Sequence, residues 1–221
     1  ISTSLNASDK LTIYANLNAR VQDTDNYVSS GYTSLGANFS QWWQRQLDMD
    51  RLRESYYYNG AFYTWNRKSA RNAKPQYWDA PHYEQYQNTN KNKNSTYSGN
   101  FGFNYDITDG LNANVEVNRR AYNRTSWGRS YVGPNTLNTQ ARYSEGSYTS
   151  EMNEFNAKLN YDKDITDDFD VTAILGYGAR QSKVISTSAS TSGGLAIPDF
   201  YTIANSTDKP SYSTNRSNSS G

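Results

Sequence analysis

The 221-residue sequence contains no cysteine and a single histidine, His82. Without cysteine the chain has no disulfide, no thiolate nucleophile and no cysteine-ligated metal site. One histidine leaves too little material for a histidine-rich metal site or a catalytic triad, and no other group of side chains indicates an enzyme. The sequence therefore predicts a protein that is not an enzyme and that carries no metal or cofactor.

Long hydrophobic runs are also absent. The longest approach, VTAILGYGA at residues 171–179, is roughly half of the 20 or so apolar residues that a membrane-spanning helix needs. Hydrophobic residues make up 35% of the chain and the mean hydropathy is −0.95, which is little material for a dry two-sided core. The net charge of +1 gives no electrostatic field that would attract a nucleic acid. We therefore expect no transmembrane helix and no nucleic-acid partner.

The sequence does contain a β-hairpin pattern that recurs along the chain. Alternating strands flank short turns rich in Asp, Asn, Gly and Ser, which accept the dihedral angles of a tight reversal. The hairpins are expected near residues 1–22, 95–122 and 151–185, and the long polar segments 23–94, 123–148 and 186–221 are expected to be loops. Since short turns alternate with long loops, antiparallel strands would place all the short turns at one end of the sheet.

The predicted strands have one apolar and one polar side. From each turn the apolar alternation continues for about nine to eleven residues, which is the length that a tilted strand needs to cross a bilayer. It ends at five polar residues: Asp23, Ser95, Arg119, Asn153 and Gln181. A common length on separate strands is typical of a hydrocarbon layer of fixed thickness, with Arg119 at its outer interface. The polar alternation would then line a wet lumen.

Two other interpretations remain open at this point. A soluble β-sandwich would cover the apolar face with a second sheet, so the chain could be a secreted carbohydrate-binding or adhesin module. A passive porin would share the barrel wall but would contain no plug.

Three segments resemble the SusC/RagA family of TonB-dependent outer-membrane transporters. They are FSQWWQRQLDMDRLR at residues 39–53, LNYDKDITDDFDVTAILGYGAR at 159–180 and GGLAIPDFYTIANS at 193–206. The resemblance implies an all-β fold: up-and-down antiparallel strands that form part of a transmembrane barrel of about 22 strands, with long extracellular loops. Residues 1–221 would be one partial barrel domain, with the plug and the TonB box expected outside this chain.

The same resemblance implies a location and a set of partners. The protein would lie in the outer membrane of a Gram-negative cell, with its loops outside, and would contact outer-membrane lipid. A SusD-like surface lipoprotein would pair with the loops, and the TonB complex would act through regions outside this chain. The imported substrate would be an oligosaccharide or a peptide.

The polar alternation of the second hairpin supplies the first candidate ligand-binding residues. They lie toward the upper lumen: Glu116, Asn118, Arg120 and Tyr122. A hydrated barrel wall is polar whether or not it binds a ligand, so lining the wall is the alternative role of these residues.

The first long loop supplies aromatic candidates. Trp65 and Trp78 are predicted to contact a ligand, because rigid rings lose little rotamer entropy on binding. The near-helical spacing of apolar residues predicts a helix over residues 39–53, with Ser40 as its cap. Partner contact or loop packing is the predicted role of four residues: Trp42, Trp43, Tyr56 and Tyr57.

Overall fold

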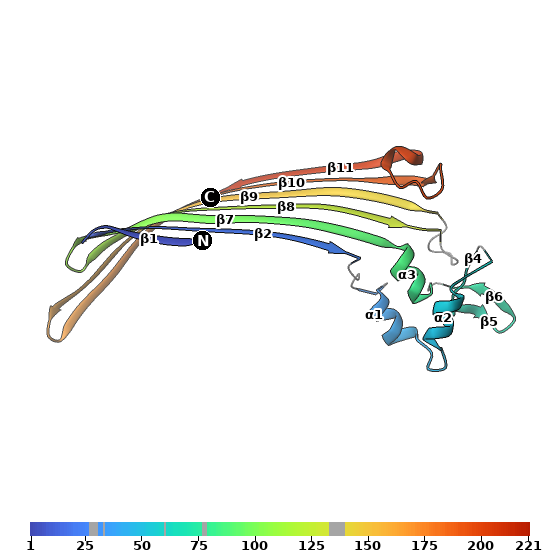
Figure 1. The fold of residues 1–221 in the computed structure, drawn as a ribbon. Coiled ribbons are helices and arrows are strands. Elements are labelled where there is room, and N and C mark those ends of the chain that lie inside the picture. Colours follow the sequence, from blue (N-terminus) through green and yellow to red (C-terminus); the bar gives the residue numbers. More distant parts are fainter. Residues whose placement is uncertain (27–30, 33, 60, 77–78, 133–139) are drawn as a thin grey trace.

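The computed structural model of the chain describes residues 1–26, 31–32, 34–59, 61–76, 79–132 and 140–221. One curved, seven-stranded antiparallel sheet dominates it (Figure 1). The strands follow chain order across the sheet: β1 (Ser2–Ser8), β2 (Leu11–Asp25), β7 (Thr89–Thr108), β8 (Leu111–Ser130), β9 (Arg142–Thr166), β10 (Phe169–Leu195) and β11 (Ser206–Ser220). The predicted fold class, an all-β chain of up-and-down antiparallel strands with long loops, is confirmed.

The short turns all lie at one end of the sheet, on the left in Figure 1, and the long loops lie at the other. The turn between β7 and β8 needs a glycine, because Gly110 has a φ of +77° and a side chain there would collide with the carbonyl oxygen of Asp162. The backbone N–H of Asp162 donates a hydrogen bond of 2.8 Å to the Gly110 carbonyl. This turn is therefore fixed to the neighbouring hairpin as well as to its own.

A small module built from the first long loop lies beyond the loop end of the sheet (Figure 1). Its elements are α1 (Leu35–Ala37), η1 (Asn38–Trp42), α2 (Met49–Ser55), β3 (Tyr57–Tyr58), β4 (Ala61–Phe62), β5 (Arg67–Ser69), β6 (Asn72–Pro75) and α3 (Pro81–Gln87). The strands β3 and β4 pair with each other, as do β5 and β6. Within the described residues, no helix is both long enough and apolar enough to cross a membrane.

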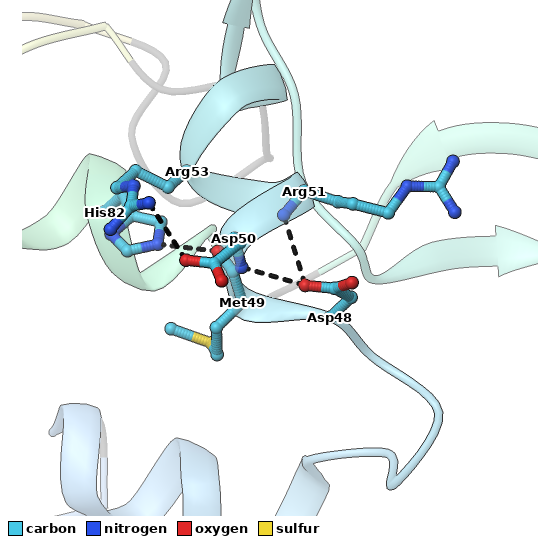
Figure 2. Close-up of polar contacts among 6 residues, drawn as sticks. All are labelled: Asp48, Met49, Asp50, Arg51, Arg53 and His82. Carbon is cyan, nitrogen blue, oxygen red and sulfur yellow. Dashed lines mark hydrogen bonds and ion pairs between the residues drawn. The ribbon is translucent and has the colours of Figure 1, made fainter.

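The helix predicted over residues 39–53 is wrong in its extent and its cap. The π-helical turn η1 ends at Trp42 and α2 begins only at Met49. Asp48 caps α2, since its Oδ1 accepts hydrogen bonds from the backbone N–H groups of Asp50, at 2.9 Å, and Arg51, at 3.3 Å (Figure 2). The extended backbone of Trp43 separates the two elements.

The loop predicted over residues 186–221 is also wrong, because most of this segment is strand. Strand β10 continues to Leu195, and β11 pairs with it from Ser206 to Ser220. Only a short connection containing η2 (Ile203–Asn205) separates them. The other two loops are shorter than expected. Strand β2 extends to Asp25 and β7 begins at Thr89, and β8 extends to Ser130 and β9 begins at Arg142.

Candidate functional site

The outward face of the sheet is apolar and uncovered. Leu17 on β2 is 64% exposed and Leu175 on β10 is 71% exposed, which are high values for apolar side chains in the middle of long strands. Further exposed members of this face are Leu5, Val21, Tyr97, Phe101, Val117, Phe155 and Tyr177. Within the described residues, no second layer packs on this face. An apolar surface of this extent is unusual for a protein in water and indicates that lipid or another protein covers it.

The border of the apolar band runs obliquely across the strands. On β8, β9 and β10 it ends at Arg119, Asn153 and Gln181, which are register partners of one another. That row crosses β2 at Leu17, yet the band on β2 continues for six residues more, to Asp23. The short turns shift in the same direction: Leu11, Tyr105 and Leu159 share one row, and the short turn of each hairpin lies progressively further along the chain from that row. Strands that tilt through a layer of constant thickness produce this oblique band.

The inward face carries a hydrogen-bonded polar network across β2, β7 and β8. Glu116 lies at its centre: its Oε2 accepts hydrogen bonds from the Tyr14 hydroxyl at 3.0 Å and the Asn100 amide at 2.8 Å. The Oε1 atom of Glu116 accepts from the Asn118 amide at 2.6 Å. Asn114 in turn donates to the Tyr14 hydroxyl at 3.1 Å. The structure thus brings the predicted residues Glu116 and Asn118 together and holds both oxygens of the carboxylate.

Three members of this network were not among the predicted site residues: Tyr14, Asn100 and Asn114. The signal for them is the register of the sheet, because Tyr14, Gly102 and Glu116 form one row. Gly102 is buried and has no side chain, which leaves space for the Tyr14 ring to reach Glu116 across β7. Aligning the turns of the first two hairpins would not have exposed this row, because it matches Tyr14 with Asn114, whereas the structure pairs Tyr14 with Gly102.

The other two predicted lumen residues lie on the same face, further from the short turns. Arg120 is exposed, one row beyond Asn118. The Tyr122 hydroxyl donates a hydrogen bond of 3.1 Å to the Asn94 side chain, and its ring makes an edge contact with Tyr148 at 5.8 Å. The guanidinium group of Arg124 lies 5.7 Å from the centre of the Tyr148 ring. Toward the loops the inward face therefore presents aromatic rings and cations in place of the amide network.

The predicted loop aromatics belong to two clusters. Trp43 contacts Phe39 at 4.5 Å and Trp65 at 5.5 Å between ring centres, so these two tryptophans pack against each other. Tyr56 and Tyr57 both contact Phe62, at 6.2 Å and 4.8 Å. Trp78 and the side chain of Trp42 lie outside the described residues.

Phe62 also connects the loop module to the sheet. Its ring makes edge contacts with Tyr83 at 4.9 Å and with Tyr131, just beyond β8, at 5.2 Å. Tyr83 on α3 has no exposed surface, and its hydroxyl donates a hydrogen bond of 2.6 Å to the Tyr131 carbonyl. The imidazole of His82 lies 3.2 Å from the Met49 carbonyl, which connects α3 to α2 (Figure 2). The module is thus anchored to the end of the sheet.

Comparison with solved structures identifies the fold. The chain superposes on a structure of the RagAB peptide transporter with a TM-score of 0.62, over 96% of its length and at 14% identity. A structure of the RagAB peptide importer in the closed-closed state gives a TM-score of 0.66, over 98% of the chain and at 11% identity. The chain has the fold of one section of RagAB.

The likeness to RagAB is one of architecture, and it covers a part of a larger protein. The chain spans 24% of the length of each RagAB chain that it matches. A scan of protein-family models gives no match, and neither does a search of curated proteins. The comparison therefore shows the fold of this section alone.

Proposed function

We propose that this chain forms part of the barrel wall and outer vestibule of a TonB-dependent outer-membrane importer related to the SusC/RagA family. The observation that carries the proposal is the oblique apolar band on the uncovered outward face. Its exposed apolar side chains support contact with bilayer hydrocarbon, and the polar network behind it supports a hydrated interior. The RagAB-like architecture is consistent with a transporter, and the two open sheet edges would pair with further strands of a complete barrel.

In this proposal the loop module forms the extracellular vestibule. It lies at the loop end of the sheet and is anchored there by Tyr83. Its surface carries exposed rings, among them Tyr57, Tyr58 and Tyr63. Rings of this kind suit contact with a SusD-like surface lipoprotein or with an oligosaccharide or peptide on its way in. The chain would supply no motor part, and coupling to the TonB complex would use a plug in the remainder of the protein.

A paired spin-label experiment on β10 tests the membrane wall. Leu175 faces outward and its neighbour Ile174 faces inward, and their exposures are nearly equal, 71% and 70%. The full-length membrane protein that contains this chain would be labelled at Leu175→Cys or Ile174→Cys and reconstituted in lipid. A label at position 175 should be relaxed strongly by oxygen, which dissolves in hydrocarbon, whereas a label at 174 should not. Weak oxygen contact at position 175 would contradict the proposal, and the secreted binding module would then be favoured.

A further inference from the structure

The outward face changes from apolar to cationic at one border of the apolar band. Arg119, Asn153 and Gln181 form the first polar row on β8, β9 and β10, and all three side chains are exposed. The preceding outward row on the same strands consists of Val117, Phe155 and Ala179. A guanidinium group and two amides thus lie directly beside the hydrocarbon-like surface.

Two more cations follow on the same face. Lys183 on β10 lies one outward row beyond Gln181, and Arg216 on β11 is the register partner of Ile185, one row further. Glu151 lies opposite Lys183 on β9 and supplies a negative charge, so the three cations leave the patch with a positive balance. We call Arg119, Asn153, Gln181, Lys183 and Arg216 the border patch.

The cations of the border patch are not neutralised by the protein. Arg119, Lys183 and Arg216 make no ion pair or side-chain hydrogen bond with another described residue. Lys91, on the outward face of β7, behaves differently, since its Nζ lies 3.2 Å from the Asp25 carboxylate. The border patch therefore offers unpaired cationic donors, whereas Lys91 is already paired with a carboxylate.

The spacing of the patch suits one anionic group of several oxygens. Neighbouring strands lie about 4.8 Å apart and successive outward rows about 7 Å apart, so Arg119 and Lys183 are separated by roughly two strand spacings and one row. Arg216 lies one strand and one row further and adds positive charge at the edge of the patch. Long flexible side chains cover that span, and the amides of Asn153 and Gln181 lie on the strands between. A phosphate group has enough acceptor oxygens to bind a guanidinium fork, an ammonium group and amide donors together.

We propose that the border patch binds the phosphate group of a membrane lipid whose acyl chains lie along the apolar band. The inference rests on the proposed wall function and adds a specific lipid class to it. A lipid is favoured over a soluble anion because the cations and the apolar row beside them are continuous on one face. A lipid with an anionic head group matches both the cations and the apolar row, whereas free phosphate would contact only the cations.

Native mass spectrometry of the full-length membrane protein in a nonionic detergent tests this inference. The probes are dioleoyl phosphatidic acid and dioleoylglycerol, which carry the same acyl chains with and without phosphate. Phosphatidic acid should be retained in preference to dioleoylglycerol. Arg119→Gln combined with Lys183→Gln should weaken its retention by roughly tenfold or more, since charge-assisted hydrogen bonds are lost.

A matched double variant is the control. Arg124→Gln combined with Lys158→Gln removes the same number of positive charges from the inward face of β8 and β9 and should leave lipid retention unchanged. Equal retention by the border-patch variant and the unmodified protein would overturn the inference, as would an equal loss in the control. Inorganic phosphate should compete only weakly, and full displacement by it at equal concentration would assign the patch to a soluble anion.

The spin labels at positions 174 and 175 separate the two proposals. Weak oxygen contact at position 175 would remove the wall function and this inference together. Strong oxygen contact with no effect of the border-patch variant on lipid retention would remove the lipid site alone.

Discussion

The phenol of Tyr14 lies against Gly102, so that a β-carbon added to Gly102 would come within 2.6 Å of the Tyr14 hydroxyl oxygen. The same carbon would lie 2.6 Å from the carbonyl oxygen of Val115. The glycine is therefore the element that lets a ring on β2 reach the Glu116 carboxylate on β8. The polar face is thus interlocked across three strands.

Gly102→Ala should destabilise the protein by about 1–3 kcal/mol, the usual effect of overpacking a filled site. The measurement is the free energy of unfolding in urea, with the full-length protein in lipid. Gly176→Ala is the control, because Gly176 lies on the same inward face as Gly102 and its added carbon would meet its nearest atom only at 4.0 Å. Equal effects of the two substitutions would show that the contact with Tyr14 and Val115 is not responsible.

Tyr14 and Glu116 should be energetically coupled. Tyr14→Phe removes the hydroxyl that donates to Glu116 and accepts from Asn114, and we expect a loss of about 0.5–1.5 kcal/mol for the hydrogen bond to Glu116. A double-mutant cycle with Glu116→Gln measures the coupling directly. Tyr97→Phe on the outward face is the control and should be close to neutral, since its hydroxyl makes no hydrogen bond with another described residue. Additive single effects would argue against a network.

Asp48→Ala should loosen α2 within the loop module. The substitution removes the acceptor of two backbone hydrogen bonds, and loss of an N-cap costs about 1 kcal/mol. Hydrogen exchange of the Asp50 and Arg51 amides should become faster. Asp50→Asn provides the contrast, because it breaks only the exposed ion pair with Arg53, at 2.9 Å, and such pairs contribute little. Unchanged exchange in Asp48→Ala would contradict the capping role.

The stability of the loop end of the sheet should depend on alkaline pH through Tyr143, which lies on β9 well outside the apolar band. Burial raises the pKa of the Tyr143 hydroxyl above its usual value of 10.0, and the Glu145 carboxylate, 3.2 Å away, raises that pKa further. The Tyr143 hydroxyl therefore holds its proton more tightly in the folded protein than in the unfolded chain. Stability that is intact below pH 10.0 should therefore fall as the pH rises through the raised pKa.

The difference in ultraviolet absorbance between the unmodified protein and Tyr143→Phe reports this titration. Glu145→Gln should lower the pKa of Tyr143 only in part, because burial is the larger cause and persists in the variant. A pKa of Tyr143 that does not change in Glu145→Gln would exclude the carboxylate as a contributor. A pKa that returns fully to 10.0 would exclude burial.

The sequence predicted the parts of the fold that hydrophobicity specifies. Alternation around Asp109 and Gly110 predicted the β7–β8 hairpin, its two faces and the common border at Arg119, Asn153 and Gln181. The strands continue beyond that border, where serine and threonine replace apolar residues and the ladder depends on backbone hydrogen bonds with a few side-chain bonds, such as Ser147 with Thr187. The pairing of β10 with β11 is of this kind, with Ser188 opposite Ser213. Side-chain patterns carry almost no signal for such a ladder, and this is why residues 186–221 were expected to be a loop.

The candidate site was predictable only to the level of a face. The alternation along the strand placed Glu116 and Asn118 on the polar face. The partner Tyr14, however, is 102 residues from Glu116 along the chain, and its contact with Glu116 depends on the space that Gly102 leaves. The helix over residues 39–53 was overextended because apolar spacing alone does not reveal that Asp48 starts a separate helix. Contacts that depend on the strand register or on helix caps can be assigned only when the three-dimensional fold is known.

Leu175 and Ile174 provide the strongest mutational test of the proposed membrane wall. In water, arginine at either of these equally exposed positions would have a similar and small effect. If hydrocarbon covers the outward face, Leu175→Arg should destabilise the protein by about 2–4 kcal/mol, whereas Ile174→Arg on the wet face should be nearly neutral. Unfolding of the full-length protein in lipid measures both. Similar unfolding free energies for the two variants would mean that both faces of β10 meet water, and the apolar band would then require a protein partner.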